Sequence, residues 1–400
     1  MKNLPLTLPP WPDGKPPPDL LIIAGDPSGD EHTALLLEAL LQRQPQLQVA
    51  ALGGPALAQA GAYSLFDLTA HAVVGLVEVL KNYFFFKDLF EQTVAWIAKH
   101  QPRAILLVDY PGFNLRLAQR LRQDGLRRLG GGKIALLYYI SPQIWAWKAR
   151  RRFAMAELLD ALAVIFPFEP ACFADTTLPV KFVGHPFAAA GRKLPVTYAA
   201  NGPVLLLPGS REAPVARIFP VMLEGFARYL ADRPEARAMT LFPNAGVRAV
   251  MEKCLAARPE LAAHITLQGV EQPAQGRMVL ASSGTMSLAC ALAGIPGAIV
   301  YRANPITYLV GRSVVNVPYL SMANLLLKEP AWPEFIQGAA KPAALAARLR
   351  ECESPSVREQ ARIYSAKLRG LLGNSGSEAQ GLPSTENQAA RWLEVHLLKS

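Results

Sequence analysis

Residues 204–211 read VLLLPGSR, and this stretch decides the fold that we expect. Its four apolar residues predict a short buried strand, and the Pro-Gly-Ser turn that follows ends on Arg211. In an α/β protein such a turn lies at the carboxyl edge of a parallel sheet, where free backbone N–H groups and a guanidinium can bind an anion. The stretch therefore predicts a parallel sheet with an anion site, and a nucleotide diphosphate is the ligand that suits it.

Buried strands alternate with helical stretches along most of the chain. In the first half we expect strands at 19–25, 49–52, 104–109, 134–140, 162–166 and 181–183, and in the second half at 204–207, 239–242, 265–267, 278–281 and 298–301. This alternation implies parallel sheets that helices cover on both faces. The expected fold class is therefore α/β, with two Rossmann-like domains whose sheets face a central ligand cleft.

The chain of 400 residues is longer than one core usually organises, so we expect two domains. Residues 1–18 are broken by prolines and are expected to form a loose arm. The first domain is expected at 19–190 and the second at 191–372. Residues 373–400 begin with a Gly/Ser-rich tract, which we expect to be flexible, and end in a terminal helix.

Hydrophobic residues make up 51% of the chain, but no uninterrupted apolar run approaches the ~18 residues of a membrane-spanning helix. The start, MKNLPLTLPPWPDGKPPP, lacks the apolar stretch of a secretory signal, so we expect a cytoplasmic protein. The four cysteines and six histidines are too scattered for a disulfide framework or a zinc site. We expect neither a structural metal nor a cofactor.

The formal net charge is +10, and one basic cluster contains Lys148, Arg150, Arg151 and Arg152. No helix-turn-helix, zinc-finger or RNA-stacking signature accompanies this charge. The positive charge therefore favours phosphorylated ligands and anionic lipid surfaces over nucleic acid.

Two turns in the second half are candidate anion sites. The second of them lies in ASSGTMSLACALAGIP at 281–296, between a strand end and a helix start, where N–H groups and hydroxyls can hold a phosphate. The candidate nucleotide-binding residues are Gly209, Ser210 and Arg211 in the first turn and Ser283, Gly284 and Thr285 in the second. We expect Arg211 to bind a diphosphate, because a charge-assisted hydrogen bond contributes about 1.5–3 kcal/mol. The alternatives are that each turn only caps its helix, and that Arg211 pairs with Glu212 or another acid.

The first half offers a candidate general base. ILLVDYPGFN at 105–114 ends a buried strand on Asp109, and a carboxylate at that edge could take a proton from an attacking hydroxyl. Asp26, Asp30 and His32, around the first strand–helix turn, are competing bases. A helix cap or an Asx turn at Asp109 is the structural alternative. The sequence does not rank these four groups.

The segment KNYFFFKDLFEQTVAWI at 81–97 is rich in aromatic residues. Three consecutive phenylalanines, Phe84, Phe85 and Phe86, cannot all face one side of a helix. With Lys81 and Lys87 beside them, they suit a contact with the membrane interface. The alternative is a helix that lies buried under a neighbouring subunit or loop.

An ordered series of short motifs resembles the lipid-A-disaccharide synthases, a family of GT-B glycosyltransferases. The series consists of AGDPSGDEH at 24–32, LGGP at 52–55, VGLVEVLK at 74–81, VDYPGFN at 108–114, YISPQIWAW at 139–147, VIFPFEP at 164–170, FVGHP at 182–186, LPGSR at 207–211, SGT at 283–285, NLL at 324–326 and PEFIQ at 333–337. The resemblance covers about residues 20–370. Single pieces are unspecific, whereas the order of the series is specific.

The resemblance implies an inverting, metal-independent transfer of 2,3-diacylglucosamine from a UDP donor to the 6-hydroxyl of 2,3-diacylglucosamine 1-phosphate, with release of UDP. It implies that the second domain holds UDP and that the first receives the acceptor. Asp109 is then the candidate base and Arg211 the ligand of the diphosphate. By the same matching, the nucleotide-side candidates are Ser283, Gly284, Thr285, Asn324 and Gln337.

The resemblance also has implications for partners. Residues 73–90, with Val77, Leu80 and Phe84–Phe86 as the candidate acyl contacts, would face acyl chains at the inner leaflet. The protein would then be cytoplasmic and peripheral on the inner membrane. Family members can pair by exchanging carboxyl-terminal segments, so a homodimer is expected as well.

The chain departs from the family pattern at several positions. Ala289 stands where a glutamate suited to the ribose hydroxyls is usual, Pro214 replaces an acid, and Ala189 follows GHP where an aspartate is common. DPSGDEHT also stands where EASGDxHG is typical. These departures leave two alternatives beside the transferase, namely a non-catalytic homologue that binds UDP-sugars or lipid phosphates, and a UDP-N-acetylglucosamine 2-epimerase.

Overall fold

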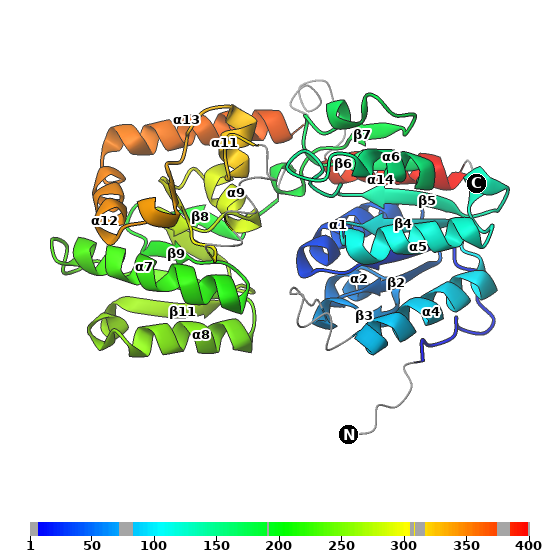
Figure 1. Ribbon diagram of the computed structural model, residues 1–400, viewed down its shortest axis with the longest axis horizontal. Coiled ribbons are helices and arrows are strands. Elements are labelled where there is room, and N and C mark those ends of the chain that lie inside the picture. The colour runs from blue at the N-terminus through cyan, green and yellow to red at the C-terminus, as the bar shows by residue number, and fades with distance from the viewer. Residues whose placement is uncertain are drawn as a thin grey trace. The chain divides into compact units, whose positions relative to one another are not determined.

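The computed structural model of the chain describes residues 7–71, 83–189, 192–304, 308, 317–373 and 385–398. It divides into two units, Met1–Ala190 with Gly376–Ser400, and Gly191–Ser375. Each unit is built on its own parallel sheet with helices around it (Figure 1). The predicted α/β class with two parallel sheets is therefore confirmed.

Unit 1 contains a seven-stranded sheet in the order β3-β2-β1-β4-β5-β6-β7. Its strands are β1 (Leu20–Ala24), β2 (Val49–Gly53), β3 (Tyr63–Asp67), β4 (Ala104–Val108), β5 (Ala135–Tyr139), β6 (Ala161–Val164) and β7 (Val180–Phe182). The register pairs Ala24 with Val108 and Val108 with Tyr139. Because these strands are parallel and end level, the residues after β1, β4 and β5 lie at one edge of the sheet.

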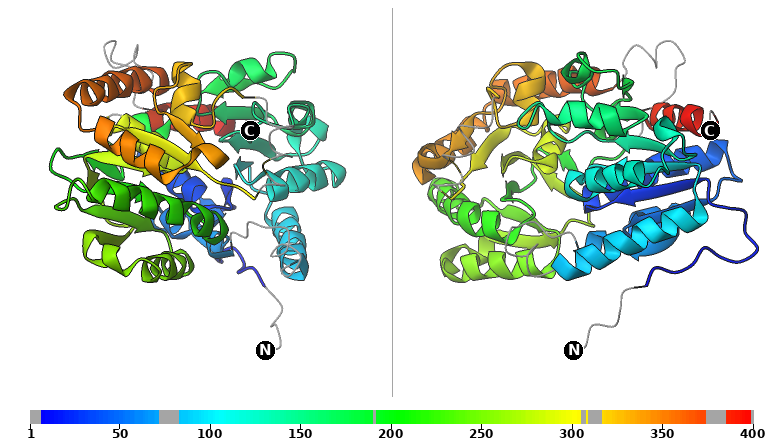
Figure 2. Two further views of the ribbon diagram at one scale, coloured as in Figure 1. Left: turned by 60° about the vertical axis from the view of Figure 1, so that its left-hand side comes forward. Right: turned by 45° about the vertical axis from the view of Figure 1, so that its right-hand side comes forward.

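Helices cover both faces of this sheet. Leu20 and Ile22 point into one core and Leu21 and Ile23 into the other, as the two-residue period of a strand requires. One face carries α1 (Pro27–Arg43), α2 (Pro55–Gln59) and α14 (Thr385–Leu398), and the other carries α4 (Tyr83–His100), α5 (Pro111–Gln123) and α6 (Arg151–Leu158) (Figures 1 and 2). The connecting 3₁₀ helices are η1 (Thr69–His71), η2 (Arg128–Gly130), η3 (Pro170–Phe173) and η4 (Pro186–Ala188).

Unit 2 contains a six-stranded sheet in the order β11-β10-β9-β13-β14-β15 and a separate pair, β12-β8. The strands are β8 (Val196–Tyr198), β9 (Val204–Leu207), β10 (Ala238–Phe242), β11 (Ile265–Gly269), β12 (Ala274–Gly276), β13 (Met278–Ala281), β14 (Gly297–Tyr301) and β15 (Glu334–Ile336). The helices are α7 (Glu212–Leu230), α8 (Ala245–Ala256), α9 (Thr285–Leu292), α11 (Met322–Leu327), α12 (Pro342–Glu351) and α13 (Pro355–Leu372), with 3₁₀ helices η5 (Pro259–His264) and η6 (Gln337–Ala339). Helices α7, α8 and α12 share one core with the sheet, and α9, α11 and α13 pack on one another.

All eleven strands expected from the sequence are present, with ends that differ by one or two residues. Four further strands, β3, β8, β12 and β15, were not expected. They are short or lie partly exposed at sheet edges, so they lack the continuous apolar run that marks the central strands.

Part of the expected loose arm packs on the core of unit 1. Leu8 and Trp11 are buried and belong to the same core as α4 and α5. The Trp11 ring meets Tyr63 at 5.4 Å and Trp96 at 6.4 Å between centroids. Prolines prevent regular hydrogen bonding here, but burial of two large apolar side chains still fixes the segment on the core.

Helix α14 packs on α1 and closes the second core of unit 1 (Figure 2). Its Trp392 and Leu393 are buried in that core. Glu394 accepts hydrogen bonds from Arg43 at 2.6 Å and from Gln44 at 2.7 Å. The last described helix is therefore an integral part of the unit that the first residues of the chain begin.

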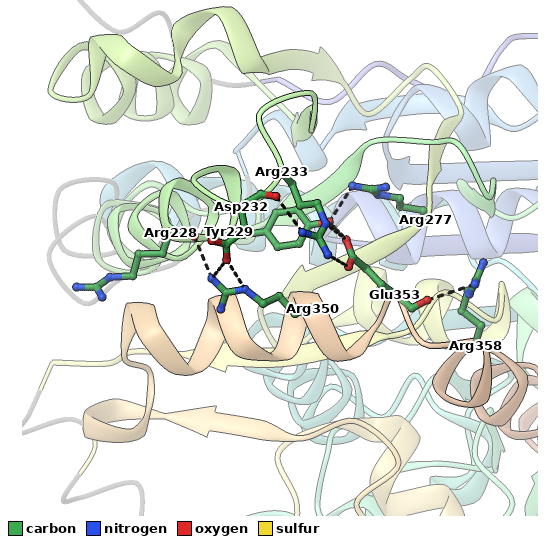
Figure 3. A network of polar contacts seen from close by, with 8 residues as sticks. All are labelled: Arg228, Tyr229, Asp232, Arg233, Arg277, Arg350, Glu353 and Arg358. Carbon is green, nitrogen blue, oxygen red and sulfur yellow. Dashed lines mark hydrogen bonds and ion pairs between the residues drawn. The ribbon is translucent and has the colours of Figure 1, made fainter.

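In unit 2 a polar network joins the end of α7 to the turn between α12 and α13 (Figure 3). The Tyr229 hydroxyl donates to Glu353 at 2.6 Å, Arg233 donates to the same carboxylate at 2.8 Å, and Arg277 donates to the Tyr229 oxygen at 2.9 Å. Burial and the hydrogen bond to Glu353 raise the pKa of Tyr229 to about 12. The network also contains Arg228, Asp232, Arg350 and Arg358.

Candidate active site and nucleotide site

Asp109 is the first residue after β4, and its backbone is held in an unusual conformation. Asp109 and Tyr110 have φ angles of 40° and 42°, in the left-handed region that non-glycine residues rarely adopt. The Asn114 side chain donates to the carbonyls of Val108 and Asp109 at 3.0 and 2.9 Å, and the Tyr138 hydroxyl also donates to the Asp109 carbonyl. Such conformations cost about 1–3 kcal/mol each and persist where surrounding contacts impose them, often at functional sites.

The environment of the Asp109 carboxyl disfavours its charged form. Burial raises the pKa of Asp109 to about 7, repulsion from Asp26 adds to this, and a backbone hydrogen bond from Tyr110 opposes it. A general base is most efficient when its pKa lies near the working pH. The carboxyl at the end of β4 therefore has the protonation behaviour that proton transfer near neutral pH needs.

A second buried carboxyl, Glu169, was missed by the sequence reasoning. Its side chain is 2% exposed and accepts a hydrogen bond from the Phe166 N–H at 2.9 Å. Burial raises the pKa of Glu169 to about 8, backbone and Trp145 hydrogen bonds oppose the rise, and the charge of Asp109 adds to it. The signal in the sequence was a lone acid inside the aromatic run VIFPFEP.

A chain of ring contacts joins motifs that are far apart in the sequence. His32 and His185 lie 6.0 Å apart between centroids, and His185 lies 5.4 Å from Phe166. Phe166 stacks on Phe168 at 5.8 Å, and Phe168 meets Trp145 at 5.5 Å. His32, which the sequence offered as a base, is 4% exposed and lies at one end of this aromatic chain.

Asp30, the third competing base, is committed to the backbone. Its carboxylate accepts hydrogen bonds from the N–H groups of Gly54, Ala56 and Leu57 at 2.7, 2.9 and 3.3 Å. The side chain is 2% exposed. Because three donors stabilise this carboxylate at the start of α2, its geometry fits a structural role better than proton transfer.

In unit 2 the two candidate anion turns lie side by side. Strands β9 and β13 pair in parallel with Leu207 opposite Ala281, and the Ser282 N–H donates to the Leu207 carbonyl at 2.8 Å. Gly209 has a φ of 120°, and a Cβ added there would lie 3.1 Å from Ser282 Oγ. The close approach of the two turns and this backbone conformation both require glycine.

The side chains of these turns differ in their exposure. Ser210, Arg211, Gly284 and Thr285 are exposed. Arg211 precedes the first residue of α7, so its guanidinium and the first N–H groups of that helix belong to one turn. The carboxyl group of Glu212, the acid considered as a partner of Arg211, lies close to Gly246 at the start of α8.

Three of the nucleotide-side candidates form side-chain hydrogen bonds with backbone groups of the protein itself. Ser283 donates to the Leu320 carbonyl at 2.9 Å. The Asn324 amide donates to the Trp332 carbonyl at 2.8 Å and accepts from the Trp332 N–H at 2.9 Å. The Gln337 amide accepts from the N–H of Ala303 at 2.8 Å and donates to the Ala303 carbonyl at 3.2 Å.

The positions that depart from the resembled pattern fit their surroundings. Ala289 and Ala189 are 0% and 4% exposed. Pro214 is the third residue of α7, within the first turn, where a missing N–H costs no intrahelical hydrogen bond.

The aromatic stretch of α4 divides between core and surface. Phe84 is 82% exposed. Phe85 and Phe86 are half-buried against the core, with Phe85 5.9 Å from Phe66. Trp96 is buried under Trp11, so it belongs to the core. Val77 and Leu80 lie outside the described residues.

Over the part of the chain that the structure describes, no helix combines the length and the apolar character that crossing a bilayer demands. Among the same residues, no three His, Cys, Asp or Glu side chains gather closely enough to hold a metal ion.

Comparisons with known proteins show which family the chain resembles. A family model described as lipid-A-disaccharide synthetase matches residues 20–382. A lipid-A-disaccharide synthase of Geobacter sulfurreducens is 34% identical over 369 residues, which are 89% of this chain and 94% of that protein. A lipid-A-disaccharide synthase 1 of Legionella pneumophila is 36% identical over 329 residues, which are 80% of this chain and 83% of that protein.

Solved structures share the fold at low sequence identity. The UDP-GlcNAc 2-epimerase of Neisseria meningitidis, bound to UDP-GlcNAc, has a TM-score of 0.58 at 11% identity and covers 95% of this chain and 99% of its own. The glycotransferase of kitacinnamycin has a TM-score of 0.55 at 15% identity, and the match covers 96% of this chain and 100% of that one. These likenesses identify the fold as the two-unit GT-B type.

Proposed function

The chain belongs to the lipid-A-disaccharide synthase family, a family of UDP-sugar glycosyltransferases, and from this premise we propose how its residues carry the reaction. The donor is UDP-2,3-diacylglucosamine and the acceptor is 2,3-diacylglucosamine 1-phosphate. The 6-hydroxyl oxygen of the acceptor attacks C1 of the donor sugar. The bond from C1 to the UDP oxygen breaks with inversion at C1, and the products are the disaccharide 1-phosphate and UDP.

Asp109 takes the proton of the attacking hydroxyl. Its pKa of about 7 supports this role, because the carboxylate is available near neutral pH and is basic enough to accept a proton. Asn114 and Tyr138 position it through its backbone carbonyl. Asp30 and His32, by contrast, shape the fold around the site.

The departing diphosphate binds at the paired turns of unit 2. Backbone N–H groups of Gly209 and Ser210 and the guanidinium of Arg211 stabilise the negative charge that develops on UDP. Ser283, Asn324 and Gln337 hold the neighbouring loops through the hydrogen bonds described above. Their contribution to nucleotide binding is therefore through the shape of the pocket's backbone.

We also propose that α4 meets the inner-leaflet surface through Phe84, which is 82% exposed beside Lys87. An exposed aromatic ring next to a cation suits the interface between water and acyl chains. A homodimer is a further proposal, supported by the exposure of Ile363 and Leu371 on α13. Sedimentation of the purified protein tests it.

The two alternatives considered from the sequence are not favoured. Relatives at 34% and 36% identity are named synthases. The likeness to the epimerase is 11% identical and concerns the fold alone.

The experiment that tests the proposed function mixes both lipid substrates with the protein and measures disaccharide and UDP. We expect the two products in equal amounts, and a loss of about 10²- to 10⁴-fold in kcat for Asp109→Asn, the range of general-base catalysis. Asp124→Asn, which changes an exposed carboxylate paired with Arg120, is the matched control. Donor binding without any disaccharide from the unmodified protein would overturn the proposal.

A further inference from the structure

A cluster of cations after β5 has no part in the function proposed so far. The loop that leaves β5 and the start of α6 carry Lys148, Arg150, Arg151 and Arg152. Arg152 is paired with Asp175 at 2.6 Å. The other three cations lie close together in the sequence, and their like charges repel one another. A bound anion would offset this repulsion.

An exposed indole holds two of these cations. Trp147 is 42% exposed. The Lys148 Nζ lies 4.5 Å from the centre of its ring, and the Arg151 guanidinium carbon lies 5.8 Å from it. Cations within about 6 Å of an indole face are attracted to it, so the ring restrains both side chains without neutralising either charge.

The loop that carries them has a constrained backbone. Ile140 and Lys148, near its two ends, have φ angles of 63° and 53°. For the β-branched Ile140 this conformation is particularly rare. Backbone strain of this kind tends to occur at ligand-binding segments. The backbone of the loop is thus held in a defined conformation at Ile140 and at Lys148.

This loop begins beside the candidate base. Strand β5 is the neighbour of β4, and the Asp109 N–H donates to the Tyr139 carbonyl at 3.1 Å, directly before the loop starts. Burial and the charge of Asp109 raise the pKa of Tyr138, and the positive charge of Arg151 opposes that rise. Arg151 is therefore close enough to act on the tyrosine whose hydroxyl holds the Asp109 carbonyl.

We propose that Lys148 and Arg151 bind the phosphate monoester of the acceptor sugar, with Trp147 as their support. This inference rests on the proposed function, in which the acceptor carries a phosphate at C1 and a reacting hydroxyl at C6. Binding the phosphate on the loop after β5 turns the other end of the same sugar ring toward the end of β4. The site thereby selects a phosphorylated acceptor and orients its hydroxyl for Asp109.

The experiment compares two acceptors, 2,3-diacylglucosamine 1-phosphate and the same lipid without phosphate, in the unmodified protein and in Arg151→Ala and Lys148→Ala. Each variant should raise KM for the phosphorylated acceptor by about 10- to 100-fold, the effect of losing a charge-assisted hydrogen bond, and should change kcat less. The kcat/KM for the dephosphorylated acceptor should fall much less, so the preference for the phosphorylated acceptor should shrink. Arg151→Lys should recover part of the preference, because it keeps the charge but not the fork of donors.

Arg122→Ala is the matched control. It removes one positive charge from α5, where Arg122 pairs with Glu157 of α6. It should leave the preference for the phosphorylated acceptor unchanged, and circular dichroism should show all variants folded. If the unmodified protein makes disaccharide but the variants keep its full preference, the inference is overturned while the proposed function stands. If no disaccharide forms at all, the proposed function itself fails.

Two further measurements separate other sources of phosphate. Calorimetry with UDP should give the same affinity in all variants, and a loss of UDP binding would assign the cations to the donor and overturn the inference. Flotation with vesicles containing anionic phospholipid should also be unchanged. Equal losses of kcat/KM for both acceptors together with lost flotation would identify a membrane contact and would likewise overturn it.

Discussion

Asp109 combines a disfavoured backbone conformation with a disfavoured charge. Its φ of 40° is imposed by hydrogen bonds from Asn114 and Tyr138 to its carbonyl, and its carboxyl is buried beside Asp26. Both features oppose folding, and in the proposed reaction the raised pKa makes Asp109 a stronger base than a solvated carboxylate would be. This residue therefore links stability to pH.

Asp109→Asn should change the pH dependence of stability in a defined direction. The pKa of Asp109 is raised from 3.8 to about 7, so between these values the folded protein keeps a proton that the unfolded chain releases. Stability consequently falls as pH rises through this window, by at most about 4 kcal/mol in all. The variant lacks this fall, so its free energy of unfolding should increase relative to that of the parent protein as pH rises. Above pH about 7 the difference should stay constant.

Urea unfolding at several pH values measures this difference. Asp124→Asn serves again as the control, because its carboxylate is exposed and paired with Arg120. A stability difference between variant and parent that stays constant from pH about 4 to about 8 would contradict the raised pKa of Asp109.

Arg211→Ala should weaken the reaction through the leaving group. Loss of one charge-assisted hydrogen bond corresponds to about 1.5–3 kcal/mol, or about 10- to 150-fold in kcat/KM. Arg217→Ala, an exposed arginine further along the same α7, is the control. Unchanged turnover of a well-folded Arg211→Ala protein would remove Arg211 from the site.

The sequence named many site residues without saying what their side chains do. Asn324 and Gln337 were placed with the nucleotide, whereas their amides pair with the backbone of Trp332 and Ala303. Which partner an amide chooses depends on tertiary contacts that no local pattern encodes. Glu169 was missed for the same reason, since its burial arises from segments far apart in the chain.

At the scale of elements, continuous apolar runs were the reliable signal. The central strands, such as β1 and β9, are buried on both faces, so their composition alone predicted them. Strand β15 carries the polar Glu334, which accepts hydrogen bonds from the N–H groups of Leu320 and Ser321 at 2.9 Å. An edge strand with such a structural carboxylate does not stand out from a loop by composition.

The exposed ring of Phe84 on α4 is the proposed membrane contact. Phe84→Ser should lower flotation with anionic vesicles, because this ring is 82% exposed and its insertion would remove apolar area from water at about 25 cal/mol per Å². The fold should be unaffected for the same reason. Val270→Ser, at an exposed apolar residue in the other unit, is the control. Equal flotation of both variants and the parent would exclude Phe84 as the contact.

At the scale of the whole molecule, α14 makes the first unit discontinuous in sequence. Trp392→Ala should destabilise unit 1 by about 3–5 kcal/mol, because the ring is 4% exposed in the core that α1 lines. Hydrogen exchange should then speed up in α1, β1 and β2 and stay unchanged in β9 and β13. Val395→Ala, on the same helix at 48% exposure, should do neither. Faster exchange in both units alike would show that they unfold together.

The return of α14 also sets an order of events during translation. All of Gly191–Ser375 is synthesised between the first part of unit 1 and the helix that completes it. The part of α1 that contacts α14 consequently stays uncovered until residues 385–398 have been synthesised, after the whole of unit 2. Unit 1 can therefore complete its second core only after all of unit 2 has been synthesised.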